Sequence, residues 1–128
     1  MVLTQADMGA GWMAGSAGSP GKPQLFSSSH ITFTKGSAFS PVVQNTVEVY
    51  RTIAAAQAAY QDEVPANSAA GGITNPGLGE ESFLNNSVPT NKELVFRKAN
   101  VLVYIWVQND KTDDPGQYAQ TVLQRIGP

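Results

Sequence analysis

The chain has 128 residues, a formal net charge of −2 and a charged fraction of 14%. This length suits one domain over residues 1–128, and the charged fraction is well below the roughly 25% that is typical of soluble domains. A weakly acidic chain lacks the basic surface that nucleic-acid binding needs, so we expect no nucleic-acid partner. No apolar run of the sequence is long enough to cross a membrane.

The chain contains no cysteine. Disulfides, zinc–thiolate sites, iron–sulfur clusters and cysteine nucleophiles are therefore excluded. The few charges and the many serine, threonine, asparagine and glutamine side chains favour an extracytoplasmic bacterial domain, either periplasmic or membrane-anchored. Met1 leads directly into a structured segment without a signal peptide, so we expect a signal or lipid anchor to precede it in the full precursor.

Local patterns organise the N-terminal part of the chain. A capping pattern predicts one helical turn over 4–8, followed by a short extended piece that uses Trp12 as a core anchor. Clean alternation of apolar and polar residues then predicts half-buried strands over 29–35 and 42–51. Asn45 interrupts the apolar face of the second strand, which indicates an edge or a bulge.

The middle of the chain combines a helix, a loop and a short strand. Thr52 is suited to cap a helix over 53–63. Glycines and prolines predict a loop over 65–79, and a short strand is expected over 81–85. The buried stripe of the helix is expected to consist of Ile53, Ala56, Tyr60 and Val64.

The strongest pattern is a hairpin with strands over 93–97 and 101–108, joined through Lys98-Ala99-Asn100. A two-residue loop pairs Phe96 with Val103, whereas a three-residue loop shifts this register by one residue. We favour the two-residue loop because it keeps the apolar faces together, although alanine fits such a turn poorly. The second strand is apolar on both faces, so we expect it to be central and covered on both sides.

A final helix is predicted over 115–126. Asp114 is suited to its N-cap, Pro115 to its first position and Gly127 to its end. Its apolar stripe consists of Tyr118, Val122 and Ile126, flanked by Ala119 and Leu123. Runs of strands joined by short turns, together with these helices, indicate an α+β fold with an antiparallel sheet of five to six strands covered by helices.

The polar residues form no recognisable catalytic or metal-binding pattern. His30 is the only histidine, so two-histidine metal sites are excluded, and we expect it to lie on the polar face of its strand. The aspartates at 110, 113 and 114 lack the order of a calcium loop. Nothing places the pairs Asp62-Glu63 and Glu80-Glu81 opposite each other for acid–base chemistry. We therefore expect no catalytic residues, no metal site and no cofactor.

The aromatic residues give the best candidate site. Tyr104 and Trp106 share one face of the strand over 101–108, and Arg97 lies across the hairpin. Together they predict a platform for an apolar or ring-shaped ligand. The alternative is that the final helix packs on Tyr104 and Trp106 and leaves no site there. A second candidate position lies between the loop over 65–79 and the sheet.

Several short motifs resemble one family. They are Thr4-Gln5-Ala6-Asp7-Met8-Gly9-Ala10-Gly11-Trp12, Glu81-Ser82-Phe83, Phe96-Arg97-Lys98-Ala99-Asn100-Val101-Leu102-Val103-Tyr104 and the closing helix over 115–126. In this order they resemble small bacterial exported or lipoprotein domains that are related in shape to the PsbP/Mog1-like α/β sandwich and to the extracellular sensor domains of bacterial kinases. The resemblance implies that fold and a non-enzymatic role, with Ala99 in place of a glycine.

These features lead us to expect a non-catalytic extracytoplasmic domain that binds a small ligand, an envelope component or a protein partner. Two alternatives remain. A carboxylate-based hydrolase or isomerase needs two acids in one cleft. A structural scaffold element of an envelope complex needs a contiguous exposed apolar patch.

Overall fold

The computed structural model describes residues 2–18, 24–36, 41–64, 72–110 and 113–127. Within these residues the chain forms one antiparallel sheet and three helical elements. The strands are β1 (Trp12–Gly18), β2 (Leu25–Lys35), β3 (Val42–Tyr50), β4 (Ile73–Thr74), β5 (Glu81–Val88), β6 (Asn91–Lys98) and β7 (Val101–Gln108). The helical elements are the short 3-10 helix η1 (Gln5–Asp7) and the α-helices α1 (Ile53–Glu63) and α2 (Pro115–Ile126).

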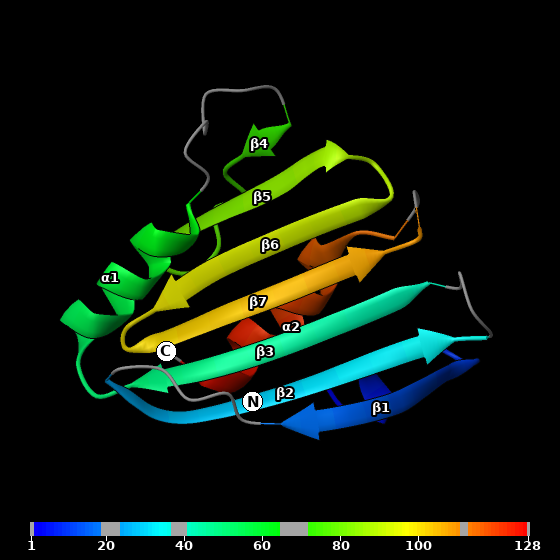
Figure 1. Ribbon diagram of the computed structural model, residues 1–128, viewed down its shortest axis with the longest axis horizontal. Helices are drawn as coiled ribbons and strands as arrows, with labels where there is room; N and C mark the ends of the chain where they lie inside the picture. Colours follow the sequence, from blue (N-terminus) through cyan, green and yellow to red (C-terminus); the bar gives the residue numbers. More distant parts are fainter. Residues whose placement is uncertain (1, 19–23, 37–40, 65–71, 111–112, 128) are drawn as a thin grey trace.

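The described strands lie in the order β1-β2-β3-β7-β6-β5-β4, and each pairs antiparallel with its neighbours (Figure 1). The predicted α+β class is therefore confirmed, and β7 is the central strand that its apolar faces predicted. Among the described residues the sheet has seven strands rather than the expected five to six. The additional strand is β4, which lies inside the segment 65–79 that was predicted to be loop. It pairs with β5.

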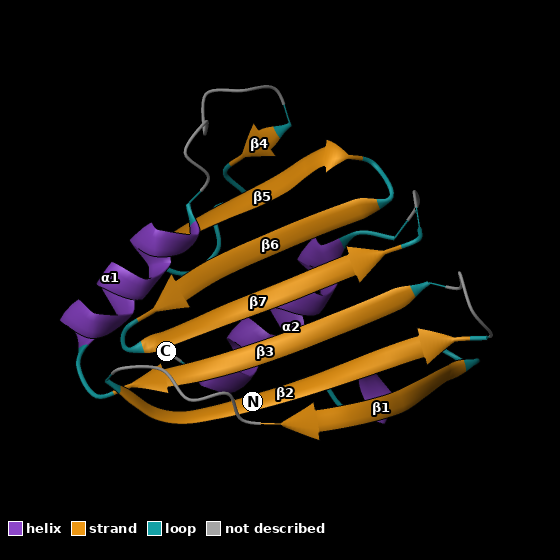
Figure 2. Ribbon diagram, viewed as in Figure 1, coloured by secondary structure: helices purple, strands orange, loops and turns teal. Residues whose placement is uncertain are grey.

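One face of the sheet packs against α2, and η1 lies on the same side (Figure 2). The odd-numbered side chains of β7, from Val101 to Val107, are buried there against Tyr118 and Val122 of α2. Trp12 belongs to the same core, so its role as an anchor is confirmed. Burial of each large apolar side chain contributes about 1.5–3 kcal/mol, which makes this face the main source of stability.

The predicted caps fix the ends of both α-helices. The Thr52 hydroxyl accepts a hydrogen bond from the Ala55 amide at 3.0 Å at the start of α1. The Asp114 carboxylate accepts one from the Gly116 amide at 2.9 Å at the start of α2. Both helices therefore begin at the predicted residue.

No helix in the described residues combines the length and the apolar character that crossing a membrane requires.

The opposite face of the sheet is covered by α1 only at one end. Tyr60 and Ala56 of α1 pack there against Leu102, Val95 and other buried side chains of β5, β6 and β7. The expectation that Ile53 belongs to this buried stripe is wrong, since Ile53 is 53% exposed. The first turn of α1, which begins at Ile53, lies beyond the ends of β3 and β7 (Figure 1). The expected cover on both sides of β7 is thus only partial on this face.

Asn45 lies neither at an edge nor at a bulge. It is fully buried in β3, between β2 and β7, where the strand pairing is regular. Its side-chain oxygen accepts a hydrogen bond from the Leu3 amide at 2.7 Å, and its amide donates one to the Tyr104 carbonyl at 3.1 Å. The interruption of the apolar pattern therefore marks a buried polar contact that ties the N-terminal segment to the sheet.

The register of the β6–β7 hairpin is the predicted one. Phe96 pairs with Val103 and Lys98 with Val101, which leaves a two-residue loop. Ala99, the first loop residue, has φ of +51°, a left-handed conformation that side chains with a Cβ atom disfavour. The conformation of Ala99 is therefore unfavourable for alanine, as predicted. The matching of the apolar faces of β6 and β7 sets the register despite this cost.

Replacing Ala99 with glycine is expected to raise the free energy of unfolding by about 0.5–1 kcal/mol, because glycine adopts this conformation without a Cβ clash. Chemical denaturation measures the effect. The same substitution at Ala58, an exposed helical position, serves as the control and should lower stability by about 1 kcal/mol. A destabilised Ala99→Gly variant would contradict the assignment of the turn.

Candidate functional site

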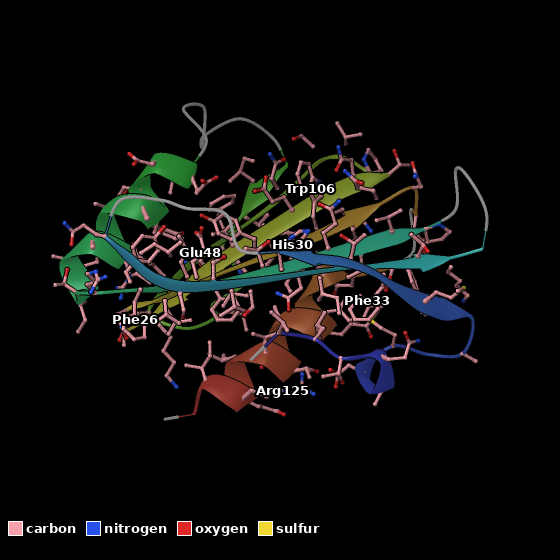
Figure 3. The ribbon with its side chains drawn as sticks, turned by 60° about the horizontal axis from the view of Figure 1, so that its bottom comes forward. Phe26, His30, Phe33, Glu48, Trp106 and Arg125 are labelled. Atoms are coloured by element: carbon pink, nitrogen blue, oxygen red, sulfur yellow. The ribbon has the colours of Figure 1, made fainter. Side chains whose placement is uncertain are left out.

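The part of the sheet face that α1 leaves uncovered carries polar and aromatic side chains. Glu48, His30 and Trp106 project to this side, whereas Phe33 and Arg125 lie on the side of α2 (Figure 3). Trp106 is 38% exposed although it belongs to the central strand. A large aromatic side chain left exposed in the middle of a sheet is a common sign of a binding surface.

Three adjoining cavities run along this face. The first, of about 400 Å³, lies between α1 and the sheet and shares Glu63 and Tyr104 with the second, of about 300 Å³. The third, of about 180 Å³, shares Glu93 and Trp106 with the second and reaches β5. We call these cavities together the open-face cleft, and the lining residues used below are Glu48, Glu63, Glu93, Tyr104 and Trp106.

Strand pairing and the end of α1 bring the acidic residues of the cleft together. Glu93 of β6 lies directly opposite Trp106 of β7. Glu48 of β3 is fully buried and accepts a hydrogen bond from the Tyr50 hydroxyl at 3.2 Å. Glu63, the last residue of α1, accepts one from the Tyr104 hydroxyl at 3.4 Å. The three carboxylates thus come from three different elements.

The cleft is electrostatically negative. Every charged residue among the described ones that line it is a carboxylate, namely Glu48, Asp62, Glu63 and Glu93. Burial, and then the charge of Glu63, raises the pKa of Glu93. Burial, and then the charge of Glu48, raises the pKa of both Tyr50 and Tyr104, so these hydroxyl groups stay protonated and donate hydrogen bonds.

The same carboxylates do not make a metal centre. In the part of the chain that the structure describes, no group of three or more histidine, aspartate or glutamate residues is placed to hold a metal ion. The cleft therefore offers separate acidic groups and hydroxyl donors, which suit hydrogen bonding and charge pairing with an organic ligand.

Glu93→Gln is expected to raise stability at pH 7. Because the folded-state pKa of Glu93 lies above its ordinary value of 4.5, the folded protein loses stability as the pH rises from that value through the folded-state pKa. Glutamine removes this loss, so the gain should be present at pH 7 and vanish below pH 4.5. Thermal unfolding of both proteins across this range measures it, and a variant less stable than wild type at pH 7 would refute the prediction.

Neutral side chains complete the walls. The Trp106 indole N–H donates a hydrogen bond to the side chain of Asn91, the first residue of β6, and this bond orients the ring. Gln44 and Thr46 of β3 line the middle cavity. The His30 ring contacts the Thr46 hydroxyl at 2.6 Å, so His30 orients a side chain of the cleft wall. This placement on the polar face of β2 agrees with the expectation for the single histidine.

The structure treats the three predicted site residues differently. Tyr104 and Trp106 line the cleft. The alternative that the final helix covers them is wrong, because α2 packs on the opposite face. Arg97 does not line the three cavities; it is 5% exposed and forms ion pairs with Glu80 and Glu81. We therefore omit Arg97 from the proposed site.

The second candidate position, between the loop over 65–79 and the sheet, receives no support. Residues 65–71 lie outside the described residues, and none of residues 72–79 lines the three cavities.

Glu48 and Glu93 were not predicted as site residues, and Glu63 was considered only within the pair Asp62-Glu63 and rejected, although Glu93 carried a signal in the sequence. The predicted hairpin register, continued toward the strand ends, places Glu93 opposite Trp106. The position of Glu48 beside Tyr104 depends on the pairing of β3 with β7, which no local pattern indicates. The position of Glu63 depends on how α1 docks.

Comparison with protein families, curated proteins and solved structures finds no match for this chain. What the fold and the cleft define is a class, an α+β domain with an open antiparallel sheet and an anionic, aromatic cleft on one face. The residues of the cleft are therefore what indicates a function.

Proposed function

We propose that this chain is a non-catalytic binding domain that takes up a small ligand in the open-face cleft. The observation that carries the proposal is the exposure of Trp106 on the central strand, at the junction of two cavities. Cavities of this size are in the range of known small-molecule sites, which combine an aromatic wall with a few fixed polar groups. Tyr104 and Glu63 supply such polar groups, already hydrogen-bonded to each other.

We also propose that the domain is extracytoplasmic and of the PsbP/Mog1-like sandwich type. The supports are the resemblance of the sequence motifs to small bacterial exported domains and the charged fraction of 14%. A layered arrangement, with one helix on each face of the sheet, agrees with that fold. Cell fractionation of a bacterium expressing the full precursor tests the location, and recovery in the cytoplasm would refute it.

A thermal-shift screen of small metabolites and envelope fragments tests the binding function. A ligand at a hundred times its dissociation constant stabilises the folded state by about 2.7 kcal/mol, a shift that such a screen detects easily. We expect at least one compound to raise the melting temperature of the wild-type protein. The same compound should leave Trp106→Ala unchanged, while that variant keeps a wild-type circular dichroism spectrum.

Phe26→Ala is the matched control. Phe26 is an aromatic residue that is 69% exposed and does not line the cleft. This variant should retain the full ligand-induced shift. A Trp106→Ala variant that unfolds, or one that still responds to every compound found, would overturn the proposed function.

A carboxylate-based hydrolase or isomerase is the second candidate, favoured by the three glutamates that line one cavity. The raised pKa of Glu93 beside the charge of Glu63 is the arrangement that acid–base chemistry uses. Chromogenic ester and glycoside substrates test it. Turnover that is lost in both Glu93→Gln and Glu63→Gln would establish this candidate, and no turnover by the wild-type protein would eliminate it.

A further inference from the structure

We infer that the ligand of the open-face cleft is an organic cation, an amine whose ammonium group lies among Glu63, Glu93 and the Tyr104 hydroxyl while its apolar or ring portion lies against Trp106. This inference rests on the proposed binding function and specifies the chemical class of its ligand.

The first support is the sign of the charge in the cavity that the aromatic residues line. Glu48, Glu63 and Glu93 surround one space of about 300 Å³, and the described residues that line it include no lysine, arginine or histidine. Negative charges that line one cavity oppose one another, and a cation placed among them relieves the repulsion. An anionic ligand would have to add its charge to those already present.

The second support is how the structure treats acidic residues elsewhere. Glu80 and Glu81 are paired with the buried Arg97, and Asp7 is paired with Arg125. Arginine therefore neutralises these three acidic groups, all of which lie outside the cleft. Within the cleft Glu63 instead accepts its hydrogen bond from the Tyr104 hydroxyl, which is a neutral donor.

The third support is the aromatic wall. Trp106 lines both the second and the third cavity, and Tyr104 lines the first and the second. Aromatic faces attract cations through the ring quadrupole and also bury the apolar part of an amine. A neutral sugar would use the same rings, but it has no charge for the carboxylates to meet, so the geometry favours the amine.

Calorimetric titration with three probes of one shape tests the inference. The probes are 2-phenylethylamine, 2-phenylethanol and 3-phenylpropanoate, which carry a positive, a neutral and a negative end group on the same ring. We expect the amine to bind at least about tenfold more tightly than the alcohol, and the carboxylate to bind most weakly. Glu93→Gln and Glu63→Gln should each weaken amine binding about tenfold and leave alcohol binding nearly unchanged.

Asp7→Asn is the matched control, because it removes one negative charge on the side of η1 and α2. It should bind the amine as the wild-type protein does. Equal affinity for the amine and the alcohol, or tighter binding of the carboxylate, would overturn the inference while the proposed binding function stands. Absence of amine binding at millimolar concentration would also overturn it. Failure of the thermal-shift screen to find any compound that depends on Trp106 would remove the proposed function itself.

Discussion

Replacing Asn45 with leucine is expected to lower the free energy of unfolding by about 3 kcal/mol. The substitution removes two hydrogen bonds in a fully buried place, those to the Leu3 amide and the Tyr104 carbonyl. The Leu3 amide would then be buried without its acceptor, and each such group costs about 1–3 kcal/mol. Urea denaturation monitored by circular dichroism measures the loss.

Gln44→Leu is the matched control for this prediction. Gln44 is the preceding residue of β3, on the open face, and is only half-buried. Its substitution should change stability by less than about 0.5 kcal/mol. Should both variants lose the same stability, or Asn45→Leu lose none, the hydrogen bonds between the N-terminal segment and the sheet would not contribute the predicted free energy.

Arg97→Met is expected to lower the free energy of unfolding by about 3 kcal/mol. Arg97 is 5% exposed and is the cation of an ion-paired group with Glu80 and Glu81, and it also donates a hydrogen bond to the Ala99 carbonyl at 2.7 Å. Methionine keeps much of the length of the side chain but leaves these acceptors without their donor, and breaking a buried charge pair costs about 3–5 kcal/mol. The partial exposure of both glutamates places the loss at the lower end of that range.

Arg51→Met is the control, because Arg51 is an exposed arginine whose guanidinium lies over the Phe26 ring at 5.9 Å. It should lose less than about 0.5 kcal/mol. Arg97→Met should still bind the ligands of the cleft at temperatures where it stays folded, since Arg97 does not line the cavities. A stable Arg97→Met variant that no longer binds these ligands would show that Arg97 contributes to the binding site.

Local patterns were sufficient for the elements whose determinants are adjacent in sequence. The caps at Thr52 and Asp114 and the stripe around Tyr118 each depend on residues within one or two turns. The β6–β7 hairpin is equally local, because a two-residue loop fixes its register. These features could be predicted because no distant part of the chain decides them.

Long-range pairing decided what the sequence could not. The exposure of Ile53 follows from where α1 ends up relative to the sheet, although its spacing from Ala56 and Tyr60 is correct for burial. The two residues of the short strand β4 are extended because they pair with the neighbouring strand β5. The side chain of the buried Asn45 is hydrogen-bonded to Leu3, a residue far away in the sequence.

The candidate site was predicted in part for the same reason. Tyr104 and Trp106 share a face by simple alternation along β7, so the aromatic wall was visible in the sequence. Glu48 joins them through the pairing of β3 with β7, and Glu63 through the docking of α1. The negative charge of the cleft is therefore a property of the assembled sheet.

The indole signals of the two tryptophans provide the most direct test of ligand binding in the open-face cleft. Trp12 is buried in the core on the α2 side of the sheet, and Trp106 lines the cleft on the other face, so a proton–nitrogen correlation spectrum reports on both sides of the sheet at once. We predict that the strongest ligand from the screen shifts the Trp106 signal in a saturable way and leaves the Trp12 signal in place. A ligand that shifts the Trp12 signal while the Trp106 signal stays in place would show binding on the α2 side of the sheet. This result would contradict the proposed binding in the open-face cleft.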